Sequence, residues 1–348
     1  MKKKLVVLLG LVMILLIGAC GNKNDMSNIE SNKEGVLTVY TTVYPLQYFT
    51  ERIGGEFVNV KSIYPAGADE HVFDPTQKDM IALSDADLFF YIGLGLEGFV
   101  ESAQKTLKNE HVKMVATAET ISEGQLGAGH HEEDEHGHEE GHDDHGHEGE
   151  HDEHEDDHEE GHDDAHGHHH EHGQFDPHVW ISPTLSIELA ASIKEALISK
   201  MPEQQEAFEK NFDLLEDDLM ELDERFKEMA NNAETKTFFV SHAAFGYIAN
   251  TYGLNQVAIA GLNSQSEPSQ KQLAKIVEQA KNENVQYILF EQNVSSKLTE
   301  VIKKEIGAES LMLHNLGVLT QEDIKNDETY FTLMEHNLRV FEQALGTK

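Results

Sequence analysis

The sequence predicts an α/β fold of two lobes, each built on a largely parallel sheet, joined by one long rigid helix. The chain has 348 residues, which is too long for one ordinary compact domain and suits two lobes with separate apolar cores. Short apolar runs alternate with helix-like stretches in both halves, which is typical of β-α-β units and parallel sheets. A long amphipathic segment lies between the halves, and it predicts the joining helix.

The first residues predict export and attachment to a lipid. Three lysines precede an apolar stretch over residues 5–17, which is too short to cross a bilayer, since a span takes about 20 residues. Residues 17–20 end in Cys20, the only cysteine of the chain, and resemble a bacterial lipobox. We therefore expect a lipoprotein signal peptide at 1–20, lipidation of Cys20, and a flexible polar tether at 21–35.

Residues 36–200 are expected to form the N-terminal lobe. The candidate strands are Leu37–Tyr44, Val58–Tyr64, Leu88–Ile92 and Val112–Ala116. Helices are expected to start near Leu46 and Asp79 and to cover Leu96–Leu107 and Thr184–Lys200. A disordered loop rich in His, Asp and Glu is expected as an insertion at 127–174.

The linking helix is expected at 201–232. Pro202 stands where a first-turn proline is tolerated, and at about 1.5 Å per residue the helix would run roughly 45 Å and reach both lobes. A coiled-coil partner would also fit the spacing, but we expect the helix to pack on its own lobes. Its apolar residues recur at alternating steps of four and three, as in an amphipathic helix: Phe208, Phe212, Leu215, Leu219, Leu222, Phe226 and Met229.

Residues 233–348 are expected to form the C-terminal lobe, with Ser269 as the N-cap of one helix. The candidate strands are Thr237–Ser241, Gln256–Ala260, Tyr287–Phe290 and Leu311–Leu313. The candidate helices are Ala243–Tyr252, Ser269–Asn282, Ser295–Glu305 and Asp327–Leu345.

One tract supplies −20 of the formal net charge of −38. Residues 130–172 hold 16 His and 20 Asp or Glu without any Lys or Arg, so the tract cannot build a core. Acidity alone would not need so many imidazoles, and we therefore predict a loop of many weak metal sites rather than a merely solvated acidic loop. No basic patch with interleaved aromatics occurs, which argues against a nucleic-acid partner. The histidines are His130, His131, His136, His138, His142, His145, His147, His151, His154, His158, His162, His166, His168, His169, His170 and His172.

Four other residues are candidate metal ligands because they stand at predicted strand ends or beside tight loops, where an open parallel sheet places its ligands. His242 and Glu291 follow predicted strands, and His71 and His178 lie in loops. Taken singly, a histidine is more often structural than a ligand, and Glu291 could cap the next helix. Three imidazoles and one carboxylate together suit a four-coordinate Zn2+ site between the lobes.

These four residues fall in four of six ordered motifs, which are Tyr44-Pro45, Glu70–Thr76, Asp176–Pro183, Ser241–Tyr247, Glu267–Ser269 and Phe290–Lys297. The set resembles the metal-binding proteins of bacterial zinc and manganese ABC importers, in particular their zinc branch. The resemblance covers the chain from about Leu37 to its end, apart from the His-rich insertion. It implies two α/β lobes joined by a rigid helix, with the metal in the cleft between them.

The resemblance implies that His71, His178 and His242 are ligands, with Glu291 as the fourth. The zinc branch has His at the third position, where the manganese branch has a carboxylate, so His242 favours zinc. Glu70 or water is the alternative fourth ligand, and we expect Asp176 to orient His178 from behind.

The resemblance also implies a function, which is extracytoplasmic capture of Zn2+ and its delivery to a membrane permease with a cytoplasmic ATPase. We expect a monomer without catalytic activity, held by its lipid on the outer face of the cytoplasmic membrane. The alternatives are a surface zinc buffer or adhesin, a manganese-binding homologue, and a zinc hydrolase. The hydrolase is disfavoured because the chain lacks a His-Glu-x-x-His motif and a fourth protein ligand would take the place of water.

Three further histidines are expected to be ordinary surface or loop residues. They are His111, His314 and His336. His314 follows a predicted strand and is the least secure of the three.

Overall fold

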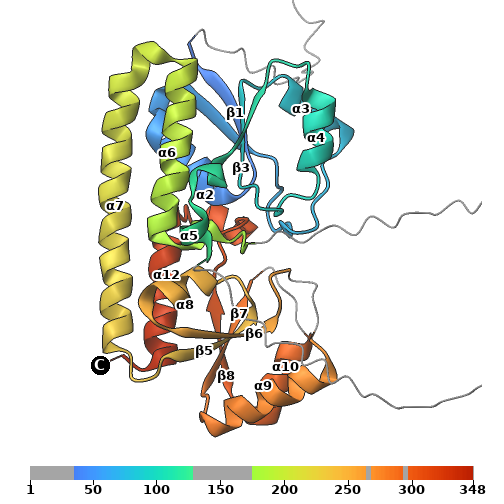
Figure 1. Cartoon of the computed structure of the whole chain (residues 1–348), viewed down its shortest axis with the longest axis vertical. Coiled ribbons are helices and arrows are strands. Elements are labelled where there is room, and N and C mark those ends of the chain that lie inside the picture. The colour runs from blue at the N-terminus through green and yellow to red at the C-terminus, as the bar shows by residue number, and fades with distance from the viewer. Residues whose placement is uncertain (1–34, 128–174, 264–267, 293–296, 348) are drawn as a thin grey trace, which may run out of the picture. The chain divides into compact units, whose positions relative to one another are not determined.

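The computed structural model describes residues 35–127, 175–263, 268–292 and 297–347 (Figure 1). The predicted signal peptide with Cys20 and the His-rich tract at 130–172 lie outside the described residues. Among the described residues, no helix combines the length and the apolarity that are needed to cross a bilayer.

Two parallel four-stranded sheets form the frame of the two lobes (Figure 1). The first sheet has the order β2-β1-β3-β4 and the second the order β6-β5-β7-β8. The strands of the first sheet are β1 (Leu37–Thr41), β2 (Val58–Ser62), β3 (Leu88–Tyr91) and β4 (Lys113–Ala116). Those of the second are β5 (Thr237–His242), β6 (Asn255–Ala260), β7 (Tyr287–Glu291) and β8 (Glu309–Leu313). The predicted fold class, two α/β lobes with parallel sheets, is confirmed.

Helices connect the parallel strands, as such sheets require. The helices of the first part are α2 (Tyr44–Gly54), α3 (Gln77–Ser84), α4 (Val100–Leu107), α5 (Glu123–Leu126) and α6 (Pro183–Lys200). Those of the second part are α8 (Gly246–Tyr252), α9 (Gln270–Asn282), α10 (Lys297–Ile306), α11 (Gln321–Lys325) and α12 (Tyr330–Leu345). Ser269 caps α9 as predicted, because its hydroxyl accepts a hydrogen bond from the backbone of Gln272.

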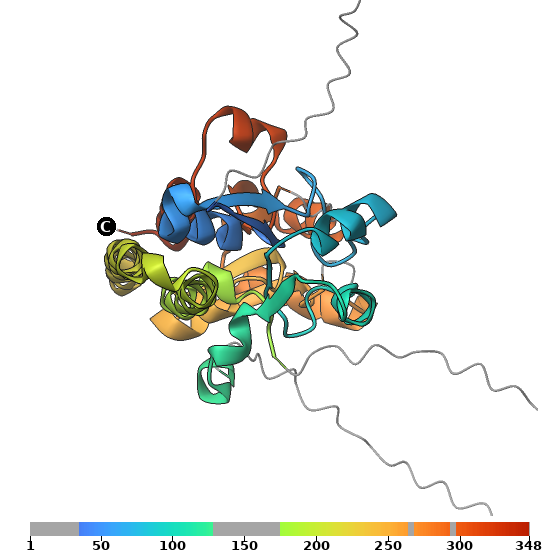
Figure 2. The same ribbon diagram turned by 90° about the horizontal axis from the view of Figure 1, so that it is seen from above.

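The joining helix α7 (Gln205–Asn232) runs beside both lobes, and Figure 2 views it together with α6 nearly end-on. Its 28 residues give a length of about 42 Å. Near its start Phe208 packs on Phe57, with ring centroids 5.9 Å apart, and near its end Phe226 packs on Phe341 at 6.4 Å. All seven apolar residues predicted for its inner face are buried. The helix therefore shares its core with both lobes.

Several predicted boundaries differ from those in the structure. The first strand ends at Thr41 rather than at Tyr44, because Pro45 lacks an N–H for a sheet and stands in the first turn of α2. The last helix begins at Tyr330 rather than at Asp327, since Thr329 caps it. The short helices α5 and α11 were not predicted, because single turns leave little periodicity in a sequence.

Two neighbouring leucines on α7 test how much its inner face stabilises the protein. Leu215 is completely buried, whereas 53% of Leu214 is exposed. We expect Leu215→Ala to lower the free energy of unfolding by about 2–5 kcal/mol, through lost burial and a residual cavity. Leu214→Ala should change it by less than about 0.5 kcal/mol. Urea unfolding of both variants measures the difference, and equal losses would contradict the assigned packing.

Candidate metal centre

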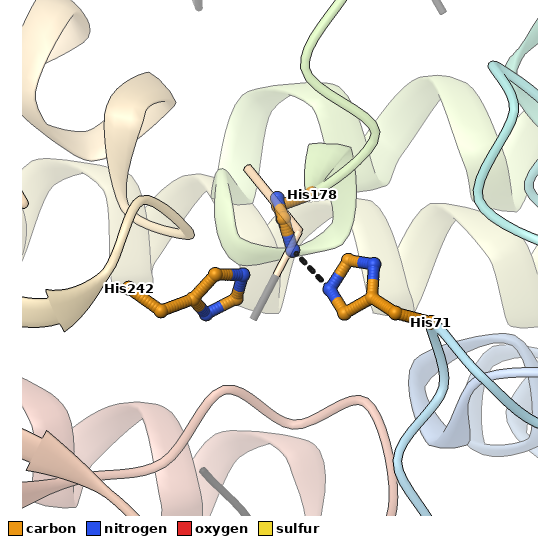
Figure 3. Close-up of side chains that lie close together, drawn as sticks. All are labelled: His71, His178 and His242. Carbon is orange, nitrogen blue, oxygen red and sulfur yellow. Dashed lines mark hydrogen bonds between the residues drawn. The ribbon is translucent and has the colours of Figure 1, made fainter. Parts of the chain in front are cut away.

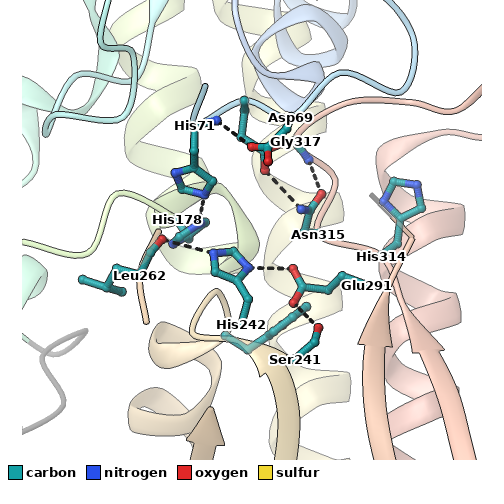
Figure 4. A network of polar contacts seen from close by, with 12 residues as sticks. Asp69, His71, His178, Ser241, His242, Leu262, Glu291, His314, Asn315 and Gly317 are labelled. Atoms are coloured by element: carbon teal, nitrogen blue, oxygen red, sulfur yellow. Dashed lines mark hydrogen bonds and ion pairs between the residues drawn. The ribbon is translucent and has the colours of Figure 1, made fainter. Parts of the chain in front are cut away.

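His242 and Glu291 meet because their strands are neighbours in register. Phe239 of β5 pairs with Ile288 of β7, and His242 and Glu291 each follow three residues later. One carboxylate oxygen of Glu291 lies 2.9 Å from Nδ1 of His242, and the other accepts a hydrogen bond from the Ser241 hydroxyl at 2.9 Å (Figure 4). All of these groups are buried. Glu291 therefore fixes the orientation of the His242 ring.

His178 is held in a similar way by a carboxylate close to it in sequence. Oδ1 of Asp176 accepts a hydrogen bond from the backbone N–H of His178 at 2.9 Å and lies 2.7 Å from its Nδ1. His178 is completely buried at the start of the short 3-10 helix η4 (Val179–Ile181). A proton on Nδ1 satisfies the carboxylate, and Nε2 is then left with a lone pair. The geometry is the one expected if Asp176 orients His178.

His71 approaches from the loop that follows β2. Its backbone N–H donates a hydrogen bond to Oδ1 of Asp69 at 3.0 Å, which tightens the loop around the partly buried ring. Its Nε2 lies 3.2 Å from Nε2 of His178 (Figure 3). The ring of His71 thus points at the same place as the lone pair of His178.

The three imidazoles form one cluster, in which one ring nitrogen from each residue lies within 4.8 Å of the other two (Figure 3). The ring centroids are 5.1 Å apart for His71 and His178, 5.3 Å for His71 and His242, and 4.8 Å for His178 and His242. Nitrogens bound to one Zn2+ at about 2.0–2.1 Å would be roughly 3.3 Å apart in a tetrahedral site. The cluster needs only a small contraction to fit such an ion.

Glu70 and Glu291 lie beside this cluster but are not among its members. The carboxylate of Glu70 is buried and accepts a hydrogen bond from the side-chain amide of Asn315 at 3.1 Å. Gly317 is pressed against the same carboxylate, since a Cβ atom on it would lie 2.5 Å from Oε1 of Glu70. The structure thus brings together three of the four predicted ligands and places Glu291 behind His242.

Burial and neighbouring charges shift the pKa values of the three histidines in different directions. It lowers the pKa of His71 to about 2, with help from the two neighbouring rings, and holds that of His178 well below its usual range. Burial also disfavours a charge on His242, but the carboxylate of Glu291 outweighs it and raises the pKa of His242 to about 9. The protonated ring can donate from Nδ1 to Glu291 and from Nε2 to the carbonyl of Leu262 at 3.1 Å. At neutral pH, His71 and His178 are therefore uncharged, and a cation that binds all three rings would have to displace a proton only from His242.

The prediction that His314 is an ordinary surface or loop histidine is wrong. Its side chain is buried, its Nδ1 accepts a hydrogen bond from the backbone of Leu316 at 2.9 Å, and its Nε2 lies 3.1 Å from a carboxylate oxygen of Asp323. Its role is to hold the turn that carries Asn315 and Gly317. His111 and His336 are exposed, as predicted.

The comparison with known families decides what kind of protein carries this centre. A model of the family ZnuA, described as "Zinc-uptake complex component A periplasmic", matches residues 39–344. The chain belongs to this family. The resemblance that was inferred from the motifs is therefore confirmed.

Individual relatives agree with the family assignment. The chain is 36% identical over 323 residues to the zinc-binding lipoprotein AdcA of Streptococcus pneumoniae, covering 92% of this chain and 57% of AdcA. It is 36% identical over 311 residues to the high-affinity zinc uptake system protein ZnuA of Bacillus subtilis, covering 89% of this chain and 87% of that protein. The chain thus spans little more than half of AdcA.

Solved structures show the same fold. The Zn(II)-bound ZnuA-like domain of Streptococcus pneumoniae AdcA matches with a TM-score of 0.67 at 32% identity, covering 89% of this chain and 99% of that domain. The laminin-binding protein Lmb of Streptococcus agalactiae, described as a bifunctional protein with adhesin and metal transporting activity, matches with a TM-score of 0.70 at 25% identity. That match covers 89% of this chain and 99% of Lmb.

The buried pair of His242 and Glu291 should make stability depend on pH. The folded pKa of His242, about 9, lies above its ordinary value of 6.5, so the stabilisation is complete below pH 6.5 and is lost as pH rises through 9. Glu291→Gln removes the charge and keeps the shape. We expect it to lower the free energy of unfolding by on the order of 3 kcal/mol at pH 6, and by much less at pH 10.

Urea unfolding of the metal-free wild type and of Glu291→Gln at both pH values measures this effect. The titration of all other groups cancels in the difference, because both proteins share them. A loss of the same size at both pH values would show that the charge on His242 does not stabilise the fold.

Proposed function

We propose that this chain captures Zn2+ outside the cytoplasm and delivers it to the membrane permease of an ABC transporter. The observation that carries the proposal is the convergence of His71, His178 and His242, whose ring nitrogens lie within 4.8 Å of one another. The family description and the names of AdcA and of the Bacillus subtilis ZnuA support zinc as the ligand. Zinc is here the cargo of the protein.

The donor set supports zinc over manganese. Neutral imidazoles favour Zn2+, whereas an oxygen-rich site would favour Mn2+. Asp176 and Glu291 stand behind two of the rings, and two carboxylates offset the charge of a divalent ion. Such a site would also bind Cu2+ or Ni2+, following the Irving–Williams order, so availability and the transporter would complete the selection.

The placement of the protein at the membrane is part of the proposal. Cleavage before Cys20 and lipidation of its thiol would anchor the chain through the tether at 21–35. The assembled importer would then consist of this protein, the permease and a cytoplasmic ATPase, with the His-rich tract at 130–172 raising the local concentration of zinc. The proposed domains are the lobes at 36–200 and 233–348 with the linking helix at 201–232.

A surface adhesin is the second candidate, because Lmb is described as having both adhesin and metal transporting activity. It does not compete with zinc capture, since one protein can carry both activities. A zinc hydrolase is disfavoured by membership of a family of zinc-uptake components.

Zinc titration of the full chain tests the proposal. A competing chelator is set to keep zinc off the weak sites of the tract. We expect one tightly held zinc in the wild type and in His111→Ala, a control whose histidine is exposed. His242→Ala should lose more than about 100-fold in affinity, because even residues that only support a ligand contribute about 10–100-fold. Equal retention by the wild type and His242→Ala would refute the site.

Glu291→Ala in the same titration assigns the fourth position. A loss as large as that of His242→Ala would make Glu291 a ligand that turns toward the metal. A loss of about 10–100-fold would match the orienting role it has in the structure. An unchanged affinity would exclude both roles.

The packing of Gly317 offers a test of Glu70. A methyl group on Gly317 would collide with the Glu70 carboxylate, whereas one on Gly98 would meet no atom within 4 Å. We expect Gly317→Ala to weaken zinc binding by about 10-fold or more, since it displaces the residue next to His71. Gly98→Ala should bind zinc like the wild type. The titration described above measures both, and unchanged binding by Gly317→Ala would exclude a role for Glu70.

A further inference from the structure

The loop of His178 is held by a hydroxyl from the other lobe. Tyr247 on α8 donates a hydrogen bond from Oη to the backbone carbonyl of Asp176 at 2.7 Å. Tyr247 and Asp176 are both 1% exposed, so water does not compete for this bond. In sequence the two residues are 71 positions apart. The bond therefore ties two separate segments together beside the cluster.

The carbonyl that Tyr247 holds belongs to the residue that orients His178. Asp176 contacts both the backbone N–H and Nδ1 of His178 through its side chain. Only Pro177 stands between them, and its ring fixes one backbone angle of the connection. A displacement of Asp176 would therefore move the carboxylate and the imidazole together.

Tyr247 is also close in sequence to His242, the second histidine of the cluster that this bond affects. Tyr247 follows His242 by five positions, and the intervening turn is fixed by two hydrogen bonds. The backbone N–H of Ala244 donates to the carbonyl of His242 at 2.9 Å, and that of Phe245 donates to the side chain of Gln256 at 2.8 Å. The segment that carries His242 thus also holds the loop that carries His178.

We propose that Tyr247 is a positioning residue for His178, which sets the spacing between the His178 and His242 rings before a cation arrives. The inference rests on the proposed function, since it assumes that the cluster is the zinc site. In this arrangement the binding site does not have to be assembled by the ion, and less ordering is needed when zinc binds. The loss of the hydroxyl should then appear as faster release of zinc.

Tyr247→Phe tests the proposal, with Tyr252→Phe as the matched control. Tyr252 lies on the same helix and donates from its hydroxyl to Oδ1 of Asp223 on α7 at 2.8 Å, a bond that does not reach the cluster. Both variants lose one hydroxyl and keep the ring. Thermal unfolding of the metal-free proteins shows whether each remains folded.

Two measurements on the full chain report on the site itself. The first is the rate at which bound zinc passes to an excess of chelator. His242→Ala serves as the blank, because any zinc that this variant still binds is expected to sit on the weak sites of the His-rich tract. We expect Tyr247→Phe to release zinc about three- to tenfold faster than the wild type, as for the loss of one hydrogen bond, and Tyr252→Phe to match the wild type. The second is the visible absorption spectrum of the first bound Co2+, which should change in Tyr247→Phe alone.

The outcomes separate this inference from the function on which it rests. Unchanged release and an unchanged cobalt spectrum in Tyr247→Phe would overturn the positioning role while leaving zinc capture intact. Equal acceleration in Tyr247→Phe and Tyr252→Phe would also overturn it, because the effect would then be general destabilisation. Wild-type release as fast as that of His242→Ala would overturn the zinc site and this inference with it.

Discussion

The convergence of three imidazoles from distant chain segments is the constraint on which the rest of the structure depends. His71, His178 and His242 are contributed by different loops and strand ends, yet their nitrogens lie within 4.8 Å of one another. A displacement of one lobe relative to the other would change the spacing of these nitrogens, so the cluster requires lobes that are fixed to each other. The helix α7 provides this fixation, because its buried face packs on both lobes through Phe208 and Phe226.

A second tie between the lobes lies close to the cluster. The segment 314–319 follows the last strand of the second sheet and crosses to the first lobe. The backbone N–H of Tyr44 donates to the carbonyl of Gly317 at 2.9 Å, and that of Gly67 donates to the carbonyl of Leu319 at 2.9 Å. The indole N–H of Trp180, two residues after His178, donates to the carbonyl of Asn315 at 2.7 Å. These bonds are part of the packing around the cluster itself and hold the loops of both first-lobe histidines.

The sequence reveals those parts of the site that local patterns encode. The inner face of α7 could be predicted because apolar residues follow the helical period, and His242 and Glu291 could be predicted because each ends an apolar strand. Asn315 could not, since its contact with Glu70 joins residues 245 positions apart and leaves no periodic trace. His314 was misjudged for a different reason, because its partner Asp323 belongs to a single-turn helix, which is too short to leave a periodic pattern in the sequence.

Glu291 shows how one residue can match a pattern and still have more than one role. A carboxylate at a strand end suits a metal ligand, but in the structure its oxygens contact Ser241 and His242. Because Glu291 raises the pKa of His242 to about 9, the His242 ring is protonated at neutral pH. Its positive charge then balances the negative charge of the Glu291 carboxylate. If the cluster is the zinc site proposed above, zinc and this proton compete for His242, and a rise in pH favours zinc.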